Sequence, residues 1–125
     1  MFSDTPRSVA EITAYIRALF DSDAVLSDVW VQGEVSNMTR ANSGHWYFTL
    51  KDGDAALRCV MWRSATAKQQ VVPRDGDALE VHGSITVYEV RGEYQLYADL
   101  VRGVGYGDLY QQFERLKAKL EAEGL

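Results

Sequence analysis

Arginines and aromatic residues recur together between residues 37 and 94, in segments where polar and apolar residues alternate. Aromatic rings stack on nucleic-acid bases, and arginine forms bidentate contacts with phosphates. A surface that combines both is typical of proteins that hold single strands. The candidate binding residues are Asn37, Arg40, His45, Tyr47, Arg58, Trp62, Arg63, Tyr88, Arg91 and Tyr94.

Some of the bulky residues in these segments have a structural explanation instead. Trp46 and Phe48 alternate with polar neighbours and are expected in a hydrophobic core. We expect Trp30 to cover an N-terminal helix. Two positions stay open on this reasoning: Trp62 either packs in the core or stacks on a base, and His45 either forms a loop-edge hydrogen bond or contacts a ligand.

Residues typical of catalysis or metal binding form no recognisable group. The sequence has no Walker loop, no zinc-protease helix motif and no nucleophile elbow. One cysteine and two histidines are too few for an ordinary structural zinc site. We therefore expect neither a catalytic centre nor a cofactor within these 125 residues.

Hydrophobic periodicity divides the sequence into helices and strands. Residues 8–21 predict a helix that begins with the capping box of Ser8 and Glu11. From Val29 the period changes to two, which is typical of a half-buried strand, and a polar loop is expected at 37–44. The further expected elements are strands at 45–50, 56–63, 79–89 and 94–101, a short helix within 64–72 and a last helix at 108–123.

This order of elements predicts a mainly β protein, a five-stranded oligonucleotide-binding (OB) barrel with an N-terminal helix, a short helix between strands 3 and 4, and a C-terminal helix. An SH3-like barrel is the nearest alternative, but it normally lacks the connecting helix. The expected division is a helical segment at 1–28 packed on the barrel, the barrel itself at 29–104, and a helical linker at 105–125.

The barrel type also predicts where ligands bind. In OB barrels the face of strands 2 and 3 binds oligomers, between the loops that join strands 1–2 and 4–5. We expect Arg40 and Arg91 on these two loops, on either side of Tyr47, Arg58 and Trp62.

Composition and charge fit an ordinary globular protein. Apolar residues make up 46% and charged residues 25% of the sequence, and no apolar run approaches the roughly 20 residues that cross a bilayer. The first residues lack a secretory-signal pattern, so we expect a cytoplasmic protein with no membrane partner. The net charge of −5 disfavours a purely electrostatic nucleic-acid binder. It is compatible with a local basic groove, because screening limits the reach of charges to about 10 Å at 0.1 M salt.

Three stretches carry a family resemblance: residues 28–37 (DVWVQGEVSN), 43–52 (SGHWYFTLKD) and 57–63 (LRCVMWR). With further matches they make residues 8–125 resemble the N-terminal domain of the exodeoxyribonuclease VII large-subunit family. The resemblance implies a parent enzyme that hydrolyses single-stranded DNA from its ends to short oligonucleotides, with this barrel gripping the substrate. It also implies that the catalytic domain lies beyond residue 125, and that a small second subunit binds the C-terminal half of the large one. Family members often carry an apolar residue in place of Trp62, which favours a core position there.

The sequence leaves two other functions open. One is an RNA-binding barrel of the anticodon-reading type, and competition between DNA and RNA oligomers would separate it, because the 2′-hydroxyl is the chemical difference. The other is a barrel that docks another protein, which failure to bind any oligonucleotide at any salt concentration would favour.

Overall fold

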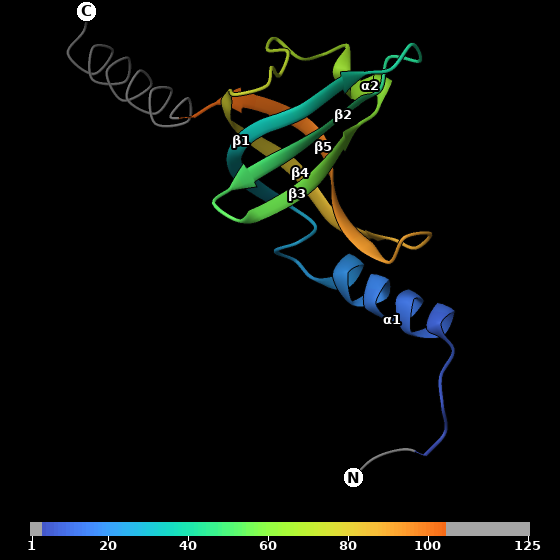
Figure 1. Cartoon of the computed structure of the whole chain (residues 1–125). Helices are drawn as coiled ribbons and strands as arrows, with labels where there is room; N and C mark the ends of the chain where they lie inside the picture. The colour runs from blue at the N-terminus through green and yellow to red at the C-terminus, as the bar shows by residue number, and fades with distance from the viewer. Residues whose placement is uncertain (1–3, 105–125) are drawn as a thin grey trace, which may run out of the picture.

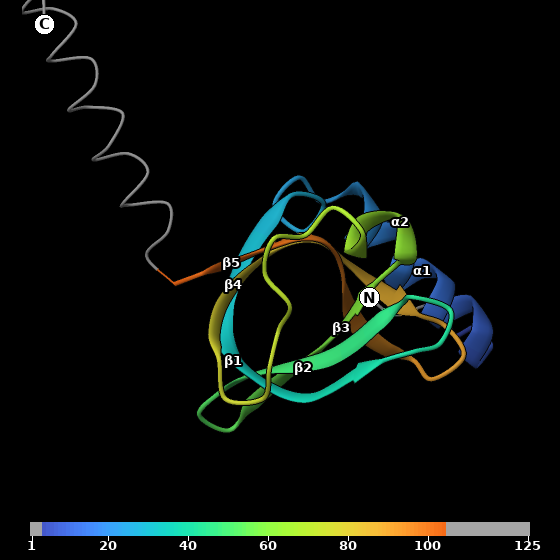
Figure 2. The same cartoon turned by 90° about the horizontal axis from the view of Figure 1, so that it is seen from above.

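Five strands close into a barrel in the part of the chain that the structure, a computed structural model, describes, which is residues 4–104 (Figure 1). The elements are α1 (Val9–Ser22), β1 (Val29–Arg40), β2 (Trp46–Asp52), β3 (Ala55–Met61), α2 (Arg63–Thr66), β4 (Ala78–Tyr88) and β5 (Glu93–Gly103). The strand order is β1-β2-β3-β5-β4, and β4 pairs with β1 to complete the ring seen in Figure 2. The expected barrel with its N-terminal and connecting helices is confirmed, whereas the expected C-terminal helix lies outside the described residues.

The interior of the barrel is filled by alternate residues of every strand. On β2 the inward side chains are Trp46, Phe48 and Leu50, which are at most 7% exposed, so the expected core positions of Trp46 and Phe48 are confirmed. Cys59 on β3 is 1% exposed, and burial raises the pKa of its thiol to about 12. That thiol is therefore protonated at neutral pH and is not a nucleophile. Because inward positions alternate with outward ones, packing this core fixes which residues face solvent.

Strand β1 is longer than the sequence pattern indicated. The expected polar loop at 37–44 is wrong in its first half, because β1 continues to Arg40 after a register shift between Ser36 and Thr39. Asn37 takes a positive φ of 55° at this bulge, a conformation that asparagine tolerates better than most residues. The next amide, that of Met38, donates to Asp75 Oδ1 at 2.8 Å, so the bulge is tied to a distant turn that local periodicity does not reveal.

Gly83 allows β4 and β5 to approach closely beside a second bulge. A Cβ atom at this position would lie 2.1 Å from the carbonyl oxygen of Tyr97, which is far inside van der Waals contact. The register of β4 on β5 shifts between His82 and Gly83 at the same place. The glycine therefore sets the position of β5, and with it the position of Tyr97 on the outer face of the barrel.

The connection from β3 to β4 covers one end of the barrel, where it crosses the view in Figure 2. Only Arg63–Thr66 is helical, so the short helix expected within 64–72 begins one residue earlier and ends sooner. Gln69 holds the rest of the connection to β5, because its side-chain amide donates to the Asp99 carbonyl at 2.9 Å and accepts from the Val101 amide at 3.0 Å. Pro73 is fully buried beneath this segment.

Helix α1 contacts the barrel mainly near its C-terminal end. Ser8 caps the helix, accepting from the Glu11 amide at 3.0 Å, as the capping box predicts. Arg17 pairs with Glu89 at 3.3 Å, and Asp21 accepts from the Thr86 hydroxyl at 3.0 Å. No residue of α1 is buried, and its apolar side chains remain largely exposed: Val9, Ile12, Ile16 and Leu19. Neither helix of the described region is long and apolar enough to span a membrane.

Trp30 does not cover α1, so that expectation is wrong. Its ring lies on the outside of the β1–β4 pair, 5.1 Å from the His82 ring, and the Arg102 guanidinium stacks over it at 3.7 Å. His82 in turn bridges two carboxylates, with Nε2 2.5 Å from Asp28 and Nδ1 2.7 Å from Asp99. These hydrogen bonds, first that to Asp28 and then that to Asp99, raise the pKa of His82 above its ordinary value.

Candidate nucleic-acid interface

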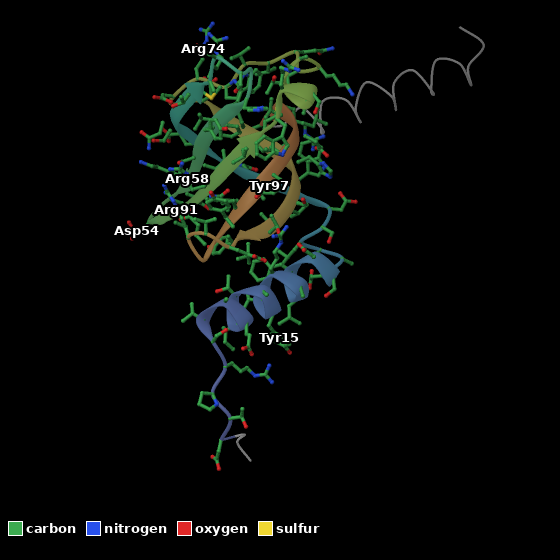
Figure 3. All side chains as sticks on the ribbon, turned by 90° about the vertical axis from the view of Figure 1, so that its right-hand side faces the viewer. Tyr15, Asp54, Arg58, Arg74, Arg91 and Tyr97 are labelled. Atoms are coloured by element: carbon green, nitrogen blue, oxygen red, sulfur yellow. The ribbon has the colours of Figure 1, made fainter. Side chains whose placement is uncertain are left out.

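A hollow of about 300 Å³ lies on the outside of the barrel, across β2, β3 and β5. We call it the groove. Its lining residues are Tyr47, Arg58, Val60, Trp62, Tyr88, Arg91, Gln95 and Tyr97. The groove lies on the side of the barrel that faces the viewer in Figure 3, where Arg58, Arg91 and Tyr97 are labelled.

Strand register brings the floor of the groove together from three strands. Val60 on β3 pairs with Tyr47 on β2 and with Tyr97 on β5, so the two rings flank it in one row. Neighbouring strands are about 4.8 Å apart, which puts the Cα atoms of the two tyrosines about 10 Å from each other. Arg58 occupies the next outward row, where it pairs with Gln95 of β5. The row between the tyrosines is apolar and flat, because Val60 is only 8% exposed.

Trp62 stands at one end of this floor and is not a core residue. The indole is 45% exposed, and its ring meets two others edge-on, His45 at 5.1 Å and Tyr97 at 5.9 Å. His45 is held in turn, since its Nδ1 accepts from the Arg63 backbone amide at 2.9 Å. The hydrogen-bonding alternative for His45 is therefore present, and through it the histidine supports Trp62. The core position favoured for Trp62 by the family pattern is contradicted by its exposure.

The charges in the groove all have one sign. Arg58 and Arg91 line it and no acidic residue does, although the whole chain carries a net charge of −5. Within residues 4–104, neither of these arginines forms an ion pair, whereas Arg17 and Arg102, which lie outside the groove, are paired with carboxylates. Figure 3 places Arg58 and Arg91 near each other and far from Arg74. The two cations are therefore available to an anionic ligand.

Four of the ten candidate residues lie elsewhere. Arg40 pairs with the inward Trp46, which sends its side chain to the opposite side of the sheet from Tyr47, and it lines a separate hollow beside Pro73. Arg40 and Arg91 thus do not face one another across the groove as we expected. Asn37 is the bulge residue of β1, and Tyr94 lies beside Phe20 of α1, with ring centroids 6.3 Å apart.

Arg63 is the fourth of these residues. It belongs to α2 and not to the third strand, which ends at Met61. The aliphatic part of its side chain lies over Gly44, whose φ is +94° and where a Cβ would meet Arg63 Cγ at 2.7 Å. Arg63 therefore packs against the loop before β2, next to the groove and outside its lining.

Three residues of the lining were not predicted: Val60, Gln95 and Tyr97. Two of them lie on β5, which pairs in parallel with β3 although more than thirty residues separate them in the chain. The alternation of Gln95 and Tyr97 with buried Leu96 and Ala98 marks both as outward residues. Knowing that β5 lies beside β3 in an OB barrel would have added them to the binding face.

A larger hollow, of about 450 Å³, lies at the end of the barrel next to α1. Its lining is mainly apolar, including Phe20, Leu26 and Ile85, and its two charged residues, Lys51 and Asp52, cancel each other. A phosphodiester chain needs cations along its path. This hollow is therefore a poorer match to a nucleic-acid strand than the smaller groove.

Comparison with known proteins agrees with the architecture. Residues 7–102 match the model of the OB-fold nucleic-acid-binding domain family. Among solved structures, a replication protein A heterotrimer bound to single-stranded DNA superposes with a TM-score of 0.52 at 17% identity, over 78% of this chain and 75% of that one. An asparaginyl-tRNA synthetase from Pyrococcus horikoshii also gives 0.52, at 12% identity over 73% of this chain and 22% of that one. At such identities these likenesses concern the fold alone.

Relatives of higher identity carry a specific name. The chain is 49% identical over 118 residues to the exodeoxyribonuclease 7 large subunit of Ralstonia nicotianae, and 50% identical to that of Bordetella pertussis. The Neisseria meningitidis subunit is 48% identical over 117 residues. Each match covers 94% of this chain but only 25–26% of the relative, so the chain spans about a quarter of their length. With a matching family model over most of its length and a closed five-stranded barrel, the chain belongs to the OB-fold nucleic-acid-binding domain family.

Proposed function

We propose that this domain binds single-stranded DNA in the groove. The observation that carries the proposal is the composition of the lining: four aromatic rings and two arginines without ion-pair partners in residues 4–104, with no acidic residue among them. In a protein of net charge −5, an acid-free surface of this kind favours an anionic ligand with planar groups. A nucleic-acid strand has both features.

The geometry favours a single strand over a duplex. Stacking on Tyr47, Trp62 or Tyr97 needs the face of a base, and in a duplex both faces are covered by neighbouring base pairs. Arg58 and Arg91 would contact phosphates of the same strand, because they line the same hollow as the rings. The roles of the individual residues are part of this proposal.

The wider role of the parent protein follows from its relatives. Because the named relatives are exodeoxyribonuclease 7 large subunits, we infer that this domain grips the substrate of a nuclease that cuts single-stranded DNA. Catalysis would reside in a different part of that protein, and a small second subunit would bind there too. On this proposal the domain itself cleaves nothing and works in the cytoplasm.

Binding and competition with a labelled oligonucleotide test the proposal. The domain should raise the fluorescence anisotropy of a labelled single-stranded DNA oligomer, and unlabelled single strand should compete better than duplex of the same sequence. The labelled DNA should stay intact throughout. An RNA oligomer that competes better than DNA would assign the groove to RNA, and binding of neither would refute a nucleic-acid function for the isolated domain.

A further inference from the structure

Gln95 presents an unused hydrogen-bond acceptor at the floor of the groove. The side chain is 8% exposed, and its Nε2 donates to Glu93 Oε1 at 2.8 Å. A carboxylate only accepts hydrogen bonds, so the amino end of the Gln95 amide must face Glu93. The carbonyl oxygen, Oε1, is thereby fixed at the other end of the amide.

No donor in residues 4–104 reaches Gln95 Oε1. In the same region, every side-chain nitrogen or oxygen that is shielded from solvent has a hydrogen-bond partner. Gln95 Oε1 has none, so it must be accessible, and Gln95 lines the groove. Gln69 makes the contrast clear, because both ends of its amide are bonded to the backbone. One buried glutamine of the barrel is a fully used brace, and the other keeps an acceptor free.

The free acceptor has a carboxylate beside it. Glu93 is two residues from Gln95 on the outward side of β5, and it pairs with Tyr88, which also lines the groove. A base edge at this point would meet acceptors and no donor from these two side chains. Cytosine and adenine carry an exocyclic amino group that donates to such acceptors. Thymine offers a carbonyl oxygen at the same place on its ring, and two acceptors facing each other repel.

We propose that Gln95 selects amino-bearing bases over thymine in the bound strand, and that Glu93 is the positioning residue that holds the Gln95 amide in the selecting orientation. The inference rests on the proposed function, because it needs a strand in the groove. Cytosine against thymine is the sharpest comparison, since the two pyrimidines present rings of the same size for stacking.

Two variants and one control separate selection from general binding. Glu93→Gln removes the carboxylate, so the Gln95 amide is free to turn and offer its amino end. Gln95→Met keeps the length of the side chain and removes its polar atoms. Glu89→Gln is the control, because it removes one negative charge from the turn of the same hairpin, where Glu89 pairs with Arg17 outside the groove.

The measurement is the dissociation constant for oligo-dC and for oligo-dT of equal length, at one salt concentration. The parent and Glu89→Gln should bind oligo-dC about five- to tenfold more tightly, the ratio that corresponds to one extra hydrogen bond. In Glu93→Gln and Gln95→Met the ratio should fall to about one, while oligo-dT still binds. Equal affinities in the parent, or a ratio that survives in Glu93→Gln, would overturn the inference and leave the proposed function standing. Failure of the parent to bind either oligomer would overturn the proposed function, and the inference with it.

Discussion

Trp62 and Trp30 offer a matched pair of tryptophans for testing where the strand binds. Both lie on the outside of the barrel with similar exposure, 45% and 39%. Trp62 lines the groove, whereas Trp30 lies on the β1–β4 pair and does not. Replacing each by alanine removes the same side chain from two different faces of one domain.

The two replacements should cost similar folding stability. Trp62 loses edge contacts with two rings, at about 0.5–1.5 kcal/mol for a favourable aromatic pair. Trp30 loses one ring contact with His82 and the stacked guanidinium of Arg102, and a cation–π pair contributes about 0.5–1 kcal/mol at an exposed site. Both variants should therefore stay folded, with free energies of unfolding lowered by about 1–2 kcal/mol.

Binding should separate them. If a base stacks on Trp62, Trp62→Ala should cost about 1–3 kcal/mol of binding free energy, which corresponds to about a 5- to 150-fold weaker dissociation constant. Trp30→Ala should bind as the parent does. Fluorescence anisotropy gives the affinities, and urea unfolding of the same preparations checks the fold. Equal losses in both variants, or unchanged affinity in Trp62→Ala, would refute the placement of the strand in the groove.

Three further outcomes are expected. Arg58→Ala should make the slope of log affinity against log salt shallower by about 0.7, the value for one phosphate contact on a single strand, and Arg40→Ala should not; equal slopes measured in salt titrations would argue against this assignment. Gly83→Ala should lower the free energy of unfolding by more than about 3 kcal/mol, because its Cβ would lie 2.1 Å from a carbonyl oxygen of β5; a parent-like urea midpoint would show that the strands can part there. Asp28→Asn should weaken the pairing of His82, whose pKa is raised in the folded protein, so the stability difference from the parent should be complete below about pH 6.5 and fade as the pH rises through the raised pKa. Its size should not exceed about 1 kcal/mol, because the Asp28 side chain is 79% exposed, and a difference that grows with pH in urea titrations would contradict the sign.

Alternation of apolar and polar residues was enough to predict the barrel and most of its core. Trp46 and Phe48 could be placed inside because period-two burial is a local property of each strand. The same rule put Tyr47 outside, where it lines the groove. It did not reveal that β1 continues past Asn37, since the bulge depends on the bond from the Met38 amide to the distant Asp75.

The parts of the groove that were missed depend on contacts between distant segments. Tyr97 and Gln95 join the floor only because β5 pairs with β3, a neighbour that is remote in sequence. The expected clasp of Arg40 and Arg91 failed for a related reason. The bulge changes the register of β1, so Arg40 leaves the sheet on the side of Trp46 and away from Tyr47. Composition identified the right kinds of residue, and topology decided which of them meet.

The most direct test of the central claim is an NMR titration of ¹⁵N-labelled domain with a single-stranded DNA oligomer. The account predicts that shift changes gather on the groove, at the Trp62 indole and at the backbone amides of Arg58, Gln95 and Tyr97. The Trp30 indole is the internal reference and should not move. Changes that gather instead around Phe20 and Leu26 at the barrel end, or no change at a DNA concentration that saturates the anisotropy signal, would contradict it.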